Sequence, residues 1–207
     1  HRLAAAAGVV VPPSALFRAG EDFALLGGRT AGLAYPLFVK PARAGSSFGI
    51  TRVETPDGLS AAVAAALEHD GKVVIEEAVP GFEVGCAVLG NDVLTVGLVD
   101  EIELSGGFFN YTEKYNLLTS SIHVPARISP EKAAEIQETA KTLYRALECT
   151  GFARVDLFLT PEGRIVFNEI NTIPGFTAHS RYPNMMKGIG LDFSTLLDRL
   201  IGLAVGA

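Results

Sequence analysis

Hydrophobic and polar positions are most informative in residues 151–171, where two apolar runs flank the tetrapeptide Thr160-Pro-Glu-Gly163. Proline and glycine stand at positions that a tight turn favours, and each run has the length and composition of a β-strand. The pattern therefore predicts an antiparallel hairpin. One face of this hairpin is apolar and suits a core, and it carries Val155, Leu157, Val166 and Ile170.

The opposite face of the same hairpin carries four polar side chains. Successive side chains of a strand point to opposite faces, so Arg154 and Asp156 share one face of the first strand. Glu169 and Asn171 share one face of the return strand for the same reason. If the turn sets the register, Arg154 lies roughly opposite Glu169, and all four side chains point to one side.

Two interpretations of this polar face remain open. The simpler one is an ion pair between Arg154 and Glu169 on a solvated surface. The other is a metal site, because two carboxylates and a neutral amide oxygen suit a hard divalent cation that also holds phosphates. The Gly/Pro-rich run Asn171-Thr-Ile-Pro-Gly-Phe-Thr177 favours the metal site, since loops that follow a rigid strand commonly meet the substrate.

The remaining pattern predicts a mixture of helices and strands. Ser129-Pro130 is a helix start signal, and the helix expected over residues 131–148 has an apolar stripe at helical spacing. This stripe comprises Ala133, Ile136, Ala140, Leu143, Tyr144 and Leu147. Further helices are expected over residues 2–7, 59–69 and 193–203. Further strands are expected over residues 9–13, 35–40, 50–53, 72–81, 82–89, 93–103 and 122–126.

A second candidate site lies between the strands expected at residues 35–40 and 50–53. The first of these strands ends in Lys40, and residues 41–49 are rich in glycine and serine. Backbone N–H groups of such a loop can approach phosphate oxygens closely, and a lysine at its edge adds a point charge. Many hairpins carry Gly-Ser turns, so an ordinary turn remains the alternative.

Composition and charge exclude several classes of protein. The 207 residues are 48% hydrophobic and 19% charged, which fits one large domain or two small ones and excludes general disorder. A net charge of −6 and the absence of Trp argue against a nucleic-acid partner. No apolar run approaches the roughly 20 residues of a membrane span. Cys86 and Cys149 lack CxxC spacing, so we expect buried free thiols in a cytoplasmic protein.

Three sequence runs carry a family resemblance: Arg154-Val-Asp156, Asn168-Glu-Ile-Asn-Thr-Ile-Pro-Gly-Phe-Thr177 and His179-Ser-Arg-Tyr-Pro183. Together they closely resemble the D-alanine–D-alanine ligase family of ATP-grasp enzymes, in particular its vancomycin-resistance (Van-type) branch. The resemblance implies an α+β ATP-grasp fold in which two subdomains with antiparallel sheets grip ATP. We expect a lid subdomain over residues 1–79 and a catalytic subdomain over residues 80–207. The family's N-terminal Rossmann-like domain is missing, so we expect a fragment of a longer protein.

The resemblance also implies roles for individual residues. Nucleotide binding is implied for Lys40, Glu76, Glu77, Val79, Glu83 and Lys114. Two Mg²⁺ ions, for which Mn²⁺ can substitute, are implied at Asp156, Glu169 and Asn171. Catalytic roles are implied for Arg154 and the Gly175 N–H, which would stabilise an oxyanion, and for Ser46 and Tyr115, which would orient the substrate. The acceptor carboxylate would contact Ser180 and Arg181.

Two of these assignments keep an alternative. Housekeeping ligases often carry lysine where this chain has Glu77, so the side chain at this position has no assured role, although its backbone contact is retained. Tyr115 would alternatively pin its loop, expected over residues 106–121, by packing.

The implied reaction joins D-alanine to a second D-configured unit at the expense of ATP, through an acyl phosphate, for peptidoglycan precursors. The Lys114-Tyr115 pair resembles ligases that use D-alanine or D-serine, whereas the lactate-using branch carries a histidine that residues 106–121 lack. With Ser180-Arg-Tyr-Pro183, this pair favours D-serine and hence vancomycin resistance. A housekeeping D-alanine–D-alanine ligase and an inactive ATP-binding fragment remain alternatives, and a glutathione-synthetase relative would not explain these runs. The expected partners are ATP, D-amino acids and a second copy in a homodimer.

Overall fold

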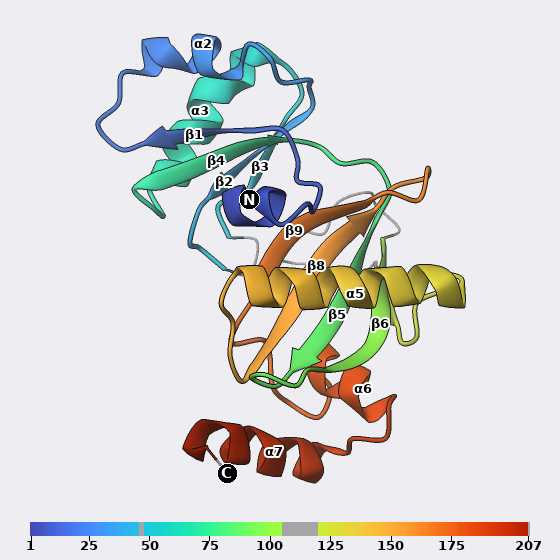
Figure 1. The fold of residues 1–207 in the computed structure, drawn as a ribbon. Helices are drawn as coiled ribbons and strands as arrows, with labels where there is room; N and C mark the ends of the chain where they lie inside the picture. Colours follow the sequence, from blue (N-terminus) through green and yellow to red (C-terminus); the bar gives the residue numbers. More distant parts are fainter. Residues whose placement is uncertain (46–47, 105–119, 207) are drawn as a thin grey trace. The chain divides into compact units, whose positions relative to one another are not determined.

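The computed structural model describes residues 1–45, 48–104 and 120–206. These residues form two compact units, a larger one of residues 1–11, 80–103 and 121–206 and a smaller one of residues 12–79. Each unit combines helices with an antiparallel sheet, as the predicted α+β class requires (Figure 1). The chain passes between the units at Val11 and Pro12, at Val79 and Pro80, and again after Glu103. Residues 1–11, which are predicted to group with residues 12–79, belong to the larger unit.

The smaller unit is a four-stranded antiparallel sheet in the order β1-β4-β2-β3. Its strands are β1 (Ser14–Arg18), β2 (Leu37–Pro41), β3 (Thr51–Val53) and β4 (Lys72–Glu77). Its helices are η1 (Phe23–Leu25), α2 (Leu26–Thr30), η2 (Pro56–Gly58) and α3 (Leu59–Leu67). Helix α3 packs on the sheet through a buried stripe at the spacing of a helix face, formed by Leu59, Ala62, Val63 and Ala66. No element is predicted for residues 14–34, because β1 is short and α2 contains two glycines, which disfavour helices.

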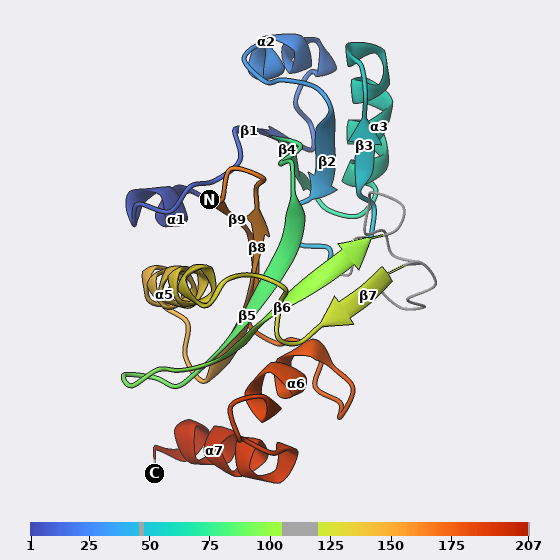
Figure 2. The same cartoon turned by 90° about the vertical axis from the view of Figure 1, so that its right-hand side faces the viewer.

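The larger unit is built on a five-stranded sheet in the order β7-β6-β5-β8-β9 (Figures 1 and 2). Its strands are β5 (Phe82–Leu89), β6 (Thr95–Leu104), β7 (Ser120–His123), β8 (Phe152–Leu159) and β9 (Ile165–Asn171). Its helices are α1 (Arg2–Ala6), α5 (Pro130–Ala146), α6 (Arg181–Lys187) and α7 (Phe193–Val205). Figure 2 shows α5 on one face of this sheet, with α6 and α7 toward the other. The two faces therefore have different coverings.

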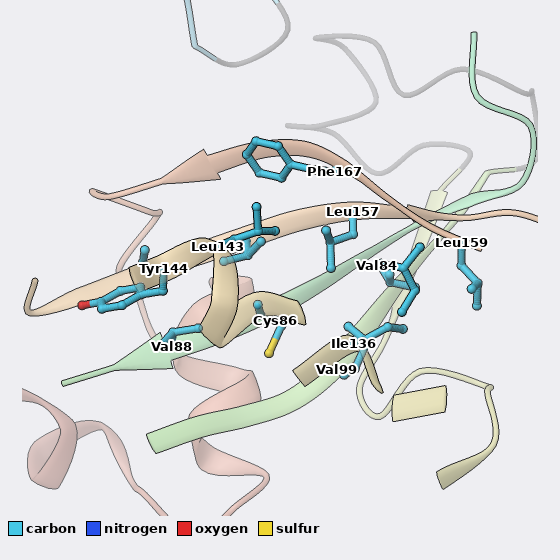
Figure 3. Close-up of a cluster of buried hydrophobic side chains, with 14 of the residues drawn as sticks. Val84, Cys86, Val88, Val99, Ile136, Leu143, Tyr144, Leu157, Leu159 and Phe167 are labelled. Atoms are coloured by element: carbon cyan, nitrogen blue, oxygen red, sulfur yellow. The ribbon is translucent and has the colours of Figure 1, made fainter. Parts of the chain in front are cut away.

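The main core lies between α5 and its face of the sheet (Figure 3). Ser129 caps the helix by accepting a hydrogen bond from the Lys132 backbone N–H at 3.3 Å. The predicted apolar stripe of α5 is confirmed, because all six of its members belong to this core. Tyr144 is fully buried there, and its hydroxyl donates to the Gly90 carbonyl at 2.8 Å. The opposite face carries polar groups as well as a smaller apolar cluster, in which Ala87 and Leu89 of β5 pack against residues of α6 and α7.

The register of β8 and β9 differs from the predicted one by two residues. Next to the turn, Leu159 pairs with Ile165, one residue beyond the expected Arg164. Farther from the turn, Leu157 pairs with Phe167 but Asp156 pairs with Glu169, so Asn168 forms a β-bulge and adds the second residue. The prediction that Arg154 faces Glu169 is therefore wrong: Arg154 faces Asn171.

The bulge also changes which β9 side chains are apolar neighbours of α5. A one-residue shift exchanges the faces of all later side chains, so Ile170 joins the main core together with Val155. Val166, by contrast, lies before the bulge and pairs with Phe158, on the face opposite Leu157. The expectation that Val166 shares the core face of Leu157 is therefore wrong.

Two expectations from composition can be compared with the described part of the chain. Cys86 and Cys149 are both free thiols, the first buried and the second half-buried. Within the described ranges, none of the helices combines the length and the apolar character that crossing a membrane requires.

Candidate active site

Polar side chains gather on the face of the larger sheet that lies opposite α5. They alternate along each strand with residues of the main core, which points them away from it. The set comprises Glu83 on β5, Asp100 on β6, Arg154 and Asp156 on β8, Glu169 and Asn171 on β9, and Arg181 at the start of α6. We call these seven residues the polar cluster.

Asp156 is the most connected carboxylate of the polar cluster. It is 1% exposed and accepts two short hydrogen bonds from Arg154, from Nε at 2.7 Å and from Nη2 at 2.6 Å. Asn171 Nδ2 donates to the same carboxylate at 2.9 Å, and Arg181 Nη1 lies 3.5 Å from it. The predicted convergence of four polar groups on one side of the hairpin is confirmed, with Asp156 rather than Glu169 as the ion-pair partner of Arg154.

Asp156, Glu169 and Asn171 also meet the requirements of a cation site. Asn171 Nδ2 donates to Glu169 at 3.1 Å as well as to Asp156, so one amide bridges the two carboxylates. Half a turn of that amide would present its oxygen instead, and the set would then offer the oxygen donors that Mg²⁺ prefers. Among the described residues, no group of three or more His, Cys, Asp or Glu side chains could hold a metal. The amide is therefore needed to complete this donor set.

The two guanidinium groups of the polar cluster are fixed positive charges. Burial alone would lower the pKa of Arg154, but its attraction to Asp156 outweighs this effect and leaves the pKa raised. Burial opposes the charge of Arg181 in the same way, and attraction to Asp100 and then to Asp156 leaves its pKa well above the ordinary value. Both groups remain cationic at any pH at which the protein is folded.

Arg181 joins three strands of the sheet. Its Nε and Nη2 each donate to Asp100 at 2.7 Å, and its Nη1 donates to Glu83 at 3.2 Å. Glu83 is predicted to bind the nucleotide and Arg181 the acceptor, and the structure brings the two side chains together. Asp100 is not among the predicted site residues, and its signal in the sequence is an acidic residue directly after the apolar run Val96-Gly-Leu-Val99.

The loop that leads from β9 to α6 holds two predicted site residues close together. Ser180 Oγ accepts a hydrogen bond from the Thr177 backbone N–H at 2.9 Å and lies 3.0 Å from the Thr177 hydroxyl. A Cβ on Gly175 would come within 3.2 Å of Ser180 Oγ. Gly175 and Ser180 therefore belong to one compact turn, although they are five residues apart.

The smaller unit holds the predicted nucleotide-binding residues of the first half of the chain. Lys40 on β2 forms an ion pair with the buried carboxylate of Glu76 on β4, its diagonal neighbour in the sheet. Glu77 accepts a hydrogen bond from the Ala34 backbone N–H at 2.8 Å, and Val79 ends the unit. The three predicted positions Ser46, Lys114 and Tyr115 lie outside the described residues.

The loop after Lys40 is anchored by residues to which the sequence analysis gave no role in the site. Arg43 forms a two-point ion pair with Asp70, with distances of 3.1 and 2.7 Å. The hydrogen bond from Arg43 holds the pKa of Asp70 below its ordinary value. On the far side of the loop, the ring of Phe48 packs edge-on against His69. Asp70 and His69 follow α3 directly, so this helix end positions both sides of the loop.

Comparisons with known proteins agree with this geometry. The family described as "D-ala D-ala ligase C-terminus" matches residues 3–202. The vancomycin B-type resistance protein VanB of Enterococcus faecalis is 50% identical over 96% of this chain and 58% of its own length. A putative D-alanine–D-lactate ligase of Streptomyces coelicolor is 52% identical over 84% of this chain and 51% of its own length. The chain thus spans just over half of these relatives.

A solved structure matches the fold closely as well. The crystal structure of the VanG D-Ala:D-Ser ligase from Enterococcus faecalis superposes with a TM-score of 0.90 and 62% sequence identity. The match covers 98% of this chain and 59% of that chain.

Proposed function

Since this chain belongs to the D-alanine–D-alanine ligase family, we propose that its protein joins D-alanine to a second D-amino acid with the hydrolysis of ATP to ADP. D-serine is the favoured acceptor, and the product would serve peptidoglycan precursor synthesis and vancomycin resistance. The free thiols of Cys86 and Cys149 are compatible with the cytoplasmic location that this role requires.

One observation supports this function above the others. The three oxygen-bearing side chains of Asp156, Glu169 and Asn171 meet next to the fixed charge of Arg154. Phosphoryl transfer between two anions requires strong neutralisation of negative charge, and this arrangement offers a cation site and a guanidinium side by side.

We assign the following roles in the reaction. The Asp156, Glu169 and Asn171 oxygens would hold Mg²⁺, which supplies charge neutralisation at the phosphates when bound. Lys40 would add positive charge at the phosphates, and Lys114 would do so from its own loop. The carboxylate of the first D-alanine would accept the γ-phosphoryl group and ADP would leave. The amine of the acceptor would then attack the resulting acyl phosphate, and inorganic phosphate would leave as the amine loses a proton and the amide bond forms.

The second step develops negative charge on the attacked carbonyl oxygen. Arg154 would stabilise this oxyanion together with the Gly175 N–H, because a preorganised donor is most effective where charge develops. Ser180 and its turn would face the acceptor, and Ser46 and Tyr115 would orient the substrates. The lid and the loop of residues 106–121 would exclude water, which otherwise hydrolyses the acyl phosphate.

The name of one relative supports D-serine as the acceptor. VanG, described as a D-Ala:D-Ser ligase, is 62% identical to this chain, whereas the putative D-alanine–D-lactate ligase is 52% identical. The chain also lacks a histidine between residues 106 and 121. D-alanine is the second candidate for the acceptor, because the family takes its name from that reaction.

A competition experiment tests the assignment. The protein, as its gene encodes it, is given Mg²⁺-ATP and D-alanine with equimolar D-serine or D-lactate, and the products are identified by mass spectrometry. A dominant D-alanyl-D-serine product supports the proposal, and a dominant D-alanyl-D-alanine product would make the protein a housekeeping enzyme. Binding of Mg²⁺-ATP without any product would overturn ligase activity.

A further inference from the structure

The strongest unexplained feature of the larger unit is the buried ion pair between Asp100 and Arg181. Asp100 is 0% exposed and binds both Nε and Nη2 of Arg181, each at 2.7 Å. Arg181 also donates to Glu83 and approaches Asp156. A buried ion pair is weak evidence for a contribution to stability, because removing its charges from water offsets much of their attraction. Its geometry is therefore the more informative property.

Gly85 provides independent evidence that the sheet is built around this pair. It lies in the middle of β5, opposite Asp100 on β6, outside the left-handed region that favours glycine. A Cβ at this position would overlap Arg181 Nη2 and lie 2.6 Å from Asp100 Oδ1. Glycine is thus required here for space rather than for backbone conformation, because the ion pair occupies the volume of the missing side chain.

The pair fixes one end of the loop that contains Gly175 and Ser180. At its start, Asn171 is bound to Asp156 and Glu169. At its end, Arg181 follows Ser180 directly and is bound to Asp100 on β6, a strand separated from β8 by β5. Residues 172–180 are therefore tied at both ends to the same polar cluster, and every nitrogen of the Arg181 guanidinium is already engaged by carboxylates.

From this arrangement we infer that Asp100 is a positioning residue: by holding Arg181, it sets the position of residues 172–180 and thereby of the acceptor. Asp100 touches no substrate and acts through Arg181. Its consequence for catalysis rests on the proposed function, whereas its effect on the loop does not.

Two variants and one matched control test this role. Asp100→Asn keeps the shape but removes the charge that holds Arg181. Gly85→Ala keeps both charges but forces the pair apart with the added Cβ. The control is Glu101→Gln, which removes the next carboxylate of β6; Glu101 is also buried but pairs with Arg127 and lies opposite Val84, on the core face of the sheet.

The first measurement is amide hydrogen exchange of the peptide covering residues 172–181. We expect exchange at least about 10-fold faster in Asp100→Asn and in Gly85→Ala, as breaking a buried charge pair implies, and unchanged exchange in Glu101→Gln. Equal exchange in wild type and both variants would overturn the inference, whether or not the protein is a ligase.

The second measurement is steady-state ligation in the protein as its gene encodes it. We expect the KM of the acceptor to rise about 10-fold or more in both variants, since small displacements of a positioning group have large effects, while the KM of ATP stays within about 2-fold. A parallel rise of both KM values would mark Asp100 as merely structural and overturn its positioning role. A wild-type protein without ligation would instead refute the proposed function and leave the exchange result to decide the role of Asp100.

Discussion

Asp156 and Glu169 lie directly opposite each other on β8 and β9, and the amide nitrogen of Asn171 donates to both carboxylates. Two ionised carboxylates in contact with one amide repel each other. The N–H group compensates for this repulsion with a partial positive charge, and a divalent cation would do so with two full charges. Arg154 already offsets the charge of Asp156, so a cation at this place would mainly balance Glu169, beside an amide that can supply either a donor or an oxygen.

Removing either carboxylate tests the metal site. We expect Asp156→Ala and Glu169→Ala to abolish Mg²⁺-dependent ATP turnover, because each loses a ligand, and to weaken Mn²⁺ binding by at least about 10-fold in calorimetry. Glu162→Ala, which removes an exposed carboxylate from the turn of the same hairpin, should leave both properties unchanged. Near-normal turnover in either ligand variant would refute the assignment.

The bulge at Asn168 can be tested by deleting this residue. Glu169 would then follow Phe167 directly, and even alternation would keep Glu169 and Asn171 on the polar face and Ile170 on the core face, with the same partners on β8. We therefore expect the deletion variant to bind Mn²⁺ in calorimetry with an affinity within about 10-fold of wild type. Asn168→Ala keeps the residue count and should keep the register. Loss of Mn²⁺ binding in the deletion variant alone would show that the bulge itself shapes the site.

The hairpin illustrates how far sequence alone reaches. The turn at Thr160-Pro-Glu-Gly163 is confirmed by a hydrogen bond from the Gly163 N–H to the Thr160 carbonyl at 2.8 Å, and the four polar groups share a face as predicted. The bulge left a signal that was overlooked: Ile165, Phe167 and Ile170 are the apolar members of β9 that join the core, and their spacing changes from two to three residues. Strand periodicity counts residues evenly, so one extra residue reverses the assignments on one side of it, here that of Val166.

Other contacts had no local signal at all. Arg181 and Asp100 are 81 residues apart in the chain, and only the packing of α6 against β5 and β6 brings them together. The same holds for Arg43 and Asp70, which lie in two different loops of the smaller unit. Sequence motifs can therefore indicate candidate site residues, whereas contacts of this kind depend on tertiary packing.

The ion pair between Glu101 and Arg127 should make stability depend on pH. The hydrogen bond from Arg127 lowers the pKa of Glu101 in the folded state. This contribution is therefore fully present above the pKa of an unfolded glutamate and is lost as the pH falls through the lower folded value. We expect the difference in Tm between wild type and Glu101→Gln to be largest near neutral pH and to shrink in acid, measured by circular dichroism. A difference independent of pH would assign the effect to packing instead.

A substitution of Arg154 can distinguish a role in ATP binding from a role in the chemical steps. Its fork holds Asp156 with Nε and Nη2, and lysine would keep the charge but present only a single point of contact. We expect Arg154→Lys to keep the KM of ATP within about 3-fold but to lower kcat for ligation about 100-fold or more, the loss typical of an oxyanion donor. Arg127→Lys is the matched control, because Arg127 forms a comparable fork with Glu101, which lies on the opposite face of the sheet.

Equal losses in ATP affinity and in kcat would mean that Arg154 serves only to hold Asp156, and the oxyanion would then need another donor. A selective loss in kcat would assign Arg154 to the chemistry rather than to ATP binding.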